Sequence, residues 1–262
     1  MKKINPKKII SKSYKRMTND FNNFVRIGFV VFIVVTPVYL FSAYYDEYVL
    51  DIFNQKGMVA YIRGSGLTKL LNWLVLFPLT SAFLVNWHRY ILFSGKKPWK
   101  YFAIDFSKYT FQWIWTSIKV GLIFWVPALA IMFLIGYFLI RYLSLGQFIP
   151  LLIIIYLLSF VFYIVRVSLI FPATAAQHNN SFKRTFKMTK NNFWNLFLVL
   201  ISFIPIALIW FVLFLLIEFT VGTESSVTML LLSNLLIFAG VFIIYGYLAS
   251  CLSECYKVLS NK

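Results

Sequence analysis

The side chains that could do chemistry are few, and most of them are cations near the ends of long apolar segments. Arg89 and Arg166 each stand close to the end of such a segment, and Lys119 stands inside another. Guanidinium groups bind phosphate and carboxylate groups through paired hydrogen bonds. If Arg89 and Arg166 both face inward, they form one cationic site able to hold a phosphate or a carboxylate. If they reach the membrane surface, they are anchors instead.

Two further residues complete this candidate anion or lipid-headgroup site. His88 is adjacent to Arg89, and Asp105 lies in the next basic segment, where it would pair with a nearby Arg or Lys. We interpret His88 as a hydrogen-bonded structural residue rather than a catalyst. The candidate site consists of Arg89, Arg166, Lys119, His88 and Asp105.

No constellation for catalysis or for metal binding is found in the sequence. The motifs of zinc proteases, serine hydrolases and Walker-type loops are absent. His88 and His178 lie in different parts of the chain, and neither is near Cys251 and Cys255 in sequence. These cysteines are one helical turn apart, which fits small residues at a helix end or a redox or metal pair. We expect no enzyme activity, no cofactor and no metal.

Composition assigns the chain to membrane proteins. Of its 262 residues, 61% are hydrophobic and 13% are charged, whereas about 25% are charged in an average soluble domain. A soluble domain of this length could not bury so many apolar side chains. Lysine and arginine number 25 against 8 acidic residues, a net charge of +17. This charge is spread over segments beside the membrane and belongs to no base-reading module, so nucleic acid is not an expected partner.

Six apolar segments are long enough to cross a hydrocarbon core of about 30 Å as helices. They cover approximately residues 27–45, 70–93, 113–140, 148–171, 193–219 and 229–252. Between the first two, Gly64-Ser65-Gly66 predicts a turn back toward the membrane. Lys and Arg concentrate in the N-terminal segment and in the loops after the second and fourth spans. The positive-inside rule therefore predicts that both termini lie in the cytoplasm.

A basic amphipathic segment precedes the first, third and fifth spans. In each segment, apolar residues fall at i, i+4 and i+11, on one side of a helix. The three sets are Ile10, Tyr14 and Phe21; Phe102, Phe106 and Trp113; and Phe182, Phe186 and Phe193. Pro6 precedes the first set and predicts a helix start. We predict an all-α membrane domain over 1–262, with six transmembrane helices in three hairpin repeats at 5–93, 97–172 and 180–256, each preceded by a basic amphipathic interfacial helix.

Basic helices with aromatic residues on one side normally lie in the membrane interface, where each Lys or Arg near anionic headgroups contributes about 1 kcal/mol. One interpretation is that these helices only set topology and anchor the chain. Another is that they bind a specific lipid headgroup or an acidic partner protein. The expected partners are the lipid bilayer, in particular anionic headgroups, and other membrane proteins.

Two stretches resemble a family of uncharacterised bacterial six-span inner-membrane proteins, chiefly alphaproteobacterial ones. The segment 87–92 reads W-H-R-Y-I-L, and the segment 166–173 reads R-V-S-L-I-F-P-A, followed by an N-F-W run at 192–194. The layout is also similar to the membrane domain fused to some glycerophosphodiester phosphodiesterases. The similarity covers about residues 84–209.

This resemblance implies an all-helical integral protein of the bacterial inner membrane with no assigned activity. The catalytic barrel of the phosphodiesterases is absent from the sequence. Gln177 and His178 stand where the family often has an acidic residue. This difference weakens a charge-pair role for Arg166.

The sequence favours two functions. The first is a non-enzymatic membrane scaffold that organises lipid or partner proteins through its cytoplasmic interfacial helices. The alternative is a small transporter or lipid-handling protein with a cationic site near Arg89 and Arg166. The alternative requires both guanidinium groups to face a cavity between the second and fourth spans, because ionisable groups inside a membrane are costly unless they serve a site.

Overall fold

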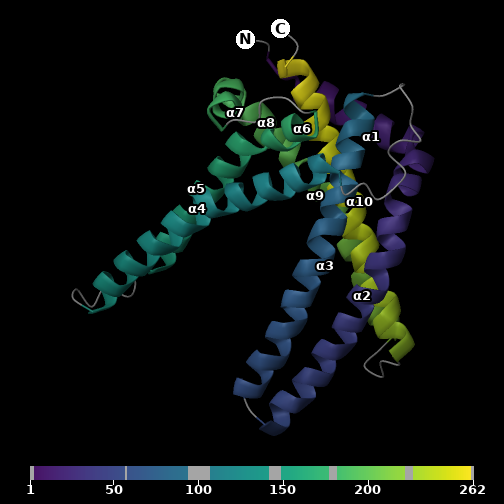
Figure 1. Cartoon of the computed structure of the whole chain (residues 1–262), viewed down its shortest axis with the longest axis vertical. Helices are drawn as coiled ribbons and strands as arrows, with labels where there is room; N and C mark the ends of the chain where they lie inside the picture. The colour runs from purple at the N-terminus through teal and green to yellow at the C-terminus, as the bar shows by residue number, and fades with distance from the viewer. Residues whose placement is uncertain are drawn as a thin grey trace.

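The computed structural model describes residues 3–56, 58–93, 107–141, 149–176, 182–221 and 227–260, and every regular element in these ranges is an α-helix. The helices are α1 (Pro6–Asn19), α2 (Phe21–Lys56), α3 (Met58–Leu92), α4 (Lys108–Arg141), α5 (Ile149–Val167), α6 (Ile170–Ala175), α7 (Phe182–Thr189), α8 (Phe193–Ile201), α9 (Ile204–Val221) and α10 (Val227–Ser260). The two termini lie at the same end of the molecule (Figure 1). The prediction of an all-α chain is confirmed for these ranges.

Four helical segments are long and apolar enough to cross a membrane. They are Lys108–Ile135, Pro150–Ala175, Phe193–Ile217 and Leu235–Ser260. A fifth span results if the segments Phe21–Phe29 and Val31–Val38, which meet at 54°, are counted as one. The described residues therefore include several helices that are long and apolar enough for a membrane protein. A total of six spans stays a prediction.

Two of these spans are interrupted shortly before a proline. Pro172 and Pro205 have no amide hydrogen, and a proline ring clashes with the carbonyl group four residues earlier. Those earlier residues are Ser168 and Ile201. Accordingly, α5 ends at Val167 and α8 ends at Ile201, and a new helix starts shortly afterwards in each case.

The predicted turn at Gly64–Gly66 is wrong, because this segment lies inside α3. A glycine in a helix costs only about 0.5–1 kcal/mol relative to alanine, which the surrounding turns can absorb. As a result α2 and α3 are 36 and 35 residues long. At 1.5 Å per residue each measures about 50 Å, which exceeds a hydrocarbon core of about 30 Å.

The N-terminal helix begins where the sequence predicts. Pro6 occupies the first turn, and the side-chain oxygen of Asn5 accepts a hydrogen bond from the Lys8 amide at 3.2 Å. Proline in the first turn and asparagine at the cap both stabilise a helix start. The break between α1 and α2 follows at Asp20, whose amide donates to the Arg16 carbonyl.

The side of α1 that faces the protein differs from the predicted aromatic stripe. The buried residues of α1 are Ile9, Ser13 and Met17. Tyr14 and Phe21, two members of the stripe, are exposed on the outside. Ile10, the third member of the stripe, is partly buried and packs against the core with Ile9 and Met17.

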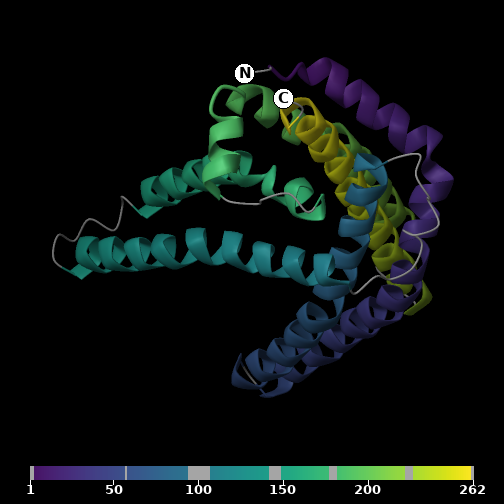
Figure 2. The same cartoon turned by 45° about the horizontal axis from the view of Figure 1, so that its top comes forward.

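The core lies where α1, α2, α3 and α10 meet. The ring of Phe24 in α2 contacts Phe83 and Trp87 of α3 and Phe242 of α10, with centroids 5.1–5.5 Å apart. The indole Nε1 of Trp87 donates to the carbonyl of Gly246 at 2.9 Å. These contacts join the beginning and the end of the chain, and α10 runs beside α2 and α3 in both views (Figures 1 and 2).

Helices α4 and α5 form a pair that extends away from this core (Figure 2). Phe124 of α4 contacts Tyr156 and Tyr163 of α5, and the Tyr163 hydroxyl donates to the carbonyl of Val120 at 2.9 Å. At its base the pair is joined to α6 through Trp113 and Phe171, 5.1 Å apart. Most other side chains of α4 are apolar and exposed, which is a surface that requires a cover such as lipid.

Candidate functional site

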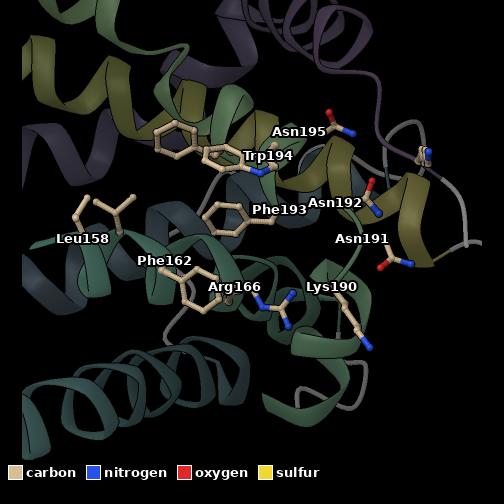
Figure 3. Close-up of a pocket in the computed structure, with 12 residues that line it drawn as sticks. Leu158, Phe162, Arg166, Lys190, Asn191, Asn192, Phe193, Trp194 and Asn195 are labelled. Atoms are coloured by element: carbon tan, nitrogen blue, oxygen red, sulfur yellow. The ribbon is translucent and has the colours of Figure 1, made fainter. Parts of the chain in front are cut away.

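A pocket of about 850 Å³ lies between the end of α5 and the beginning of α8. It is lined by Lys3, Leu158, Val161, Phe162, Arg166, Lys190, Asn191, Asn192, Phe193, Trp194, Asn195 and Phe197. The Arg166 side chain extends in the direction of Lys190, and the rings of Phe162 and Phe193 form the apolar part of the wall (Figure 3). Pockets of about 300–1,000 Å³ hold small ligands in many proteins.

Arg166 is held in place by two aromatic rings. Its guanidinium carbon lies 5.0 Å from the ring centroid of Phe186 and 5.9 Å from that of Phe162. Its carbonyl accepts a hydrogen bond from the Thr189 hydroxyl at 3.2 Å, which joins the end of α5 to α7. Cation–π contacts of this kind orient a guanidinium group without neutralising it.

The N-terminal segment forms one edge of the pocket. The amide of Ile4 donates to the side-chain oxygen of Asn192 at 2.8 Å, and both residues are buried. This hydrogen bond brings Lys3 to the pocket. Asn192 precedes α8 and forms no side-chain capping bond to it.

The pocket carries positive charge. Three of its lining residues, Lys3, Arg166 and Lys190, are cationic, and none is an acid. Three asparagines add polar groups, and the remaining side chains are apolar. An arrangement of cations and asparagine side chains suits a phosphate group, which accepts several charge-assisted hydrogen bonds at once.

Arg89, the predicted partner of Arg166, has other contacts. Its Nη1 donates to the carbonyl of Ala175, at the end of α6, at 3.2 Å. Its guanidinium carbon lies 4.4 Å from the ring centroid of Tyr109 and 5.6 Å from that of Phe93. Arg89 does not line the Arg166 pocket, so the described residues place the two guanidinium groups in separate surroundings.

His88 and Lys119 also lie apart from the pocket. His88 is buried, and its Nδ1 forms a hydrogen bond of 2.7 Å with the Ser253 hydroxyl, which joins α3 to α10. Lys119 is exposed, with Nζ 5.2 Å from the ring centroid of Trp115. Asp105 lies outside the described residues. Of the four candidates that the structure describes, Arg166 alone lines this pocket.

A charged cluster that sequence reasoning missed is centred on Glu254 in α10. The side chain is 1% exposed, and its carboxylate lies 2.6 Å from Nζ of Lys12, 3.3 Å from Nζ of Lys257 and 3.8 Å from Nη2 of Arg16. The sequence does contain a feature that could have predicted this cluster. Glu254 is a single acid within an apolar helix, and a buried charge requires a partner of opposite charge. Lys12 and Arg16 are four residues apart, on one side of α1.

The two cysteines are buried free thiols in α10. Within the ranges that the structure describes, no group of three or more His, Cys, Asp and Glu side chains could hold a metal ion. Cys251 and Cys255 pack in the same hydrophobic core as Trp87 and Phe24. Their surroundings are those of small core residues.

No family model, no curated protein and no solved structure matches this chain. The resemblance to bacterial six-span inner-membrane proteins therefore stays a prediction.

Proposed function

We propose that this chain is a non-enzymatic, multi-pass protein of the bacterial inner membrane that organises anionic phospholipids at the cytoplasmic surface. The observation that carries this proposal is the cationic pocket at Arg166, which combines three basic side chains with an apolar wall and has no acid among its lining residues. Phospholipids combine an anionic group and apolar chains in the same way.

Six spans and cytoplasmic termini are part of the proposal. Three helix pairs support it, because α2 contacts α3, α4 contacts α5, and α9 contacts α10. In the proposed arrangement each pair crosses the membrane and returns, which is the repeat that the sequence predicts. The second basic segment, 97–106, lies outside the described residues.

The basic helix α1 supports a location at the membrane surface. Its aromatic residue Tyr14 and the neighbouring Phe21 are exposed, and its charged residues are basic. Aromatic side chains and lysines are the groups that a helix presents to the headgroup region. At this surface α1 would also be accessible to acidic partner proteins, which is the scaffold role that the sequence suggests.

The experiment is to purify the full chain in a mild detergent and compare its bound lipids with those of the source membrane. We expect enrichment of phosphatidylglycerol and other anionic lipids over zwitterionic ones, and a smaller enrichment after washing at high salt, because salt screens surface charge. A bound-lipid composition equal to that of the membrane would contradict the proposal.

The second candidate, a small transporter or lipid-handling protein, is favoured by the same pocket. Because Arg89 does not line the pocket, this second function depends on Arg166 and not on a pair of arginines. A lipid-handling protein would accelerate the movement of labelled phospholipid between the leaflets of reconstituted vesicles, and a scaffold would leave that rate at the level of protein-free vesicles. This comparison separates the two functions.

A further inference from the structure

We propose that the Arg166 pocket binds the phosphate group of one anionic glycerophospholipid, with an acyl chain lying along the apolar surface of α5. This inference rests on the proposed function and names the ligand of its site. The geometry points to a phosphate because Arg166, Lys190 and Lys3 surround the pocket, and three cations suit a group that is itself charged and has several acceptor oxygens.

The first step of the argument is the state of the Arg166 guanidinium group. Its Nε is buried and has no hydrogen-bond partner among the described residues. Leaving a buried donor unsatisfied is costly, and the cost is higher for a charged group. The rings of Phe162 and Phe186 hold the group in position, so an arriving phosphate would find it already oriented.

The second step concerns the beginning of α8. The first amide groups of a helix have no partner within it, and they attract anions. The Asn192 side chain forms no capping bond to α8, and its oxygen accepts a hydrogen bond from the Ile4 amide. Residues 193–195, which supply the first amides of α8, also line the pocket. The residues that begin α8 therefore lie at the pocket together with its cations.

The third step is the balance of charge outside the pocket. The acid Glu254 is already paired with Lys12, Arg16 and Lys257. Among the described residues, no acid lines the pocket beside Arg166, Lys190 and Lys3. This excess of positive charge favours an anionic ligand.

The fourth step separates a lipid from a soluble phosphate compound. Leu158, Val161 and Phe162 of α5 line the pocket and are exposed, and further apolar side chains continue along α5 away from it. Trp194 is 70% exposed at the mouth, as tryptophans are at the level of lipid headgroups. A sugar phosphate would leave this apolar surface uncovered, whereas an acyl chain covers it.

The test is native mass spectrometry of the full chain in detergent, titrated with phosphatidate, phosphatidylglycerol and phosphatidylcholine. We expect one tight site that prefers phosphatidate and phosphatidylglycerol. Arg166→Gln and Lys190→Gln should each weaken binding at this site by roughly tenfold to a hundredfold, the effect of losing a hydrogen bond to a charged group. Lys190 is exposed, so its substitution tests the site even if Arg166→Gln misfolds.

The matched control is Lys183→Gln, because Lys183 is exposed on α7 and does not line the pocket. Lys183→Gln removes one positive charge, as Lys190→Gln does, and should leave the affinity for the first bound lipid unchanged. If Lys183→Gln, Lys190→Gln and Arg166→Gln weaken binding equally, general surface charge binds the lipid, and this inference is wrong while the proposed function stands. If wild-type protein shows no preference for anionic lipid, the proposed function fails as well.

A second arm distinguishes the source of the phosphate. Glycerol 1-phosphate and inorganic phosphate are added as competitors of bound phosphatidylglycerol. We expect no displacement at concentrations about a hundredfold above that of the lipid, because neither competitor covers the apolar wall. Displacement at concentrations equal to that of the lipid would identify a soluble phosphate compound as the ligand and overturn the assignment to a lipid.

Discussion

Oε2 of Glu254 lies 2.6 Å from Nζ of Lys12, so a carboxylate in the last helix of the chain binds a cation in the first. The carboxylate is 1% exposed and the lysine side chain 52% exposed, so the acid is on the protein side of the contact. Lys257 and Arg16 complete the cluster. Because of this arrangement, α1 is fixed to α10 by charge as well as by its apolar residues.

Glu254→Gln should loosen α1. The substitution keeps the size of the side chain but removes the charge that binds Lys12, Arg16 and Lys257. The three cations are partly exposed and can turn to water, so we expect a loss of about 1–3 kcal/mol in the free energy of unfolding. The measurements are the thermal unfolding midpoint in detergent and the rate of tryptic cleavage within α1, which should rise.

The control for this variant is Asp20→Asn. Asp20 is 25% exposed and pairs with Arg16 at 3.3 Å within four residues, a type of pair that contributes at most about 1 kcal/mol. The thermal unfolding midpoint should therefore fall less in Asp20→Asn than in Glu254→Gln. Equal decreases in the midpoint would show that burial of Glu254 adds no stability to its contacts with the cations.

Gly246→Ala should destabilise the core. A Cβ atom at Gly246 would overlap the ring of Phe24, which is buried between α3 and α10. Adding a methyl group to a filled core typically costs about 1–3 kcal/mol. The matched variant is Gly121→Ala in α4, where the added methyl group would lie 3.9 Å from its nearest neighbour, Cδ1 of Trp125.

Gly121→Ala should be neutral or stabilising by about 0.5–1 kcal/mol, because alanine favours helices. Both variants are compared with wild-type protein by their thermal unfolding midpoints in the same detergent. A lower midpoint for Gly121→Ala than for Gly246→Ala would contradict the described packing of α2 against α10.

Arg89→Gln should affect stability but not lipid binding. The substitution removes the hydrogen bond to the Ala175 carbonyl and the contact with Tyr109, which together join α3 to α6 and α4. We expect a loss of about 1–3 kcal/mol in stability and an unchanged first lipid site in native mass spectrometry. Equal weakening of lipid binding by Arg89→Gln and Arg166→Gln would restore the single paired site that the sequence suggests.

Membrane topology can be tested by cysteine labelling without replacing the native cysteines. Cys251 and Cys255 are 0% exposed, so they should not react with a membrane-impermeant maleimide in the folded protein. Lys3→Cys should be labelled only after the cytoplasmic side is opened, and Lys56→Cys and Arg141→Cys should be labelled in intact cells. Labelling of Lys3→Cys in intact cells would contradict cytoplasmic termini.

The sequence predicts helices better than it predicts their contacts. Composition and apolar length predict the four candidate spans that the described residues contain, and Pro6 predicts the start of α1, because these signals are local. Gly64–Gly66 misleads because glycine only weakens a helix and does not end it. The breaks before Pro172 and Pro205 follow from the chemistry of proline, although the sequence alone leaves open whether such a proline bends a span or interrupts it.

The candidate site is harder to predict from the sequence, because it depends on contacts between residues far apart in the chain. Arg166 can be identified from the sequence because it is a cation at the end of an apolar segment, and it lines the pocket. Lys3 and Asn192 cannot, because the hydrogen bond that brings the N-terminus to α8 joins residues far apart in the chain. The separation of Arg89 from Arg166 likewise depends on the placement of α6, which no short motif encodes.

The contact between Glu254 and Lys12 also has a consequence for how the protein is made. Lys12 is translated before Glu254, so α1 has no carboxylate partner from α10 until α10 has been synthesised. Until then Lys12 lacks the Glu254 carboxylate, whereas Arg16 already has Asp20 four residues away. Synthesis of α10 is therefore the event that supplies the partner of Lys12.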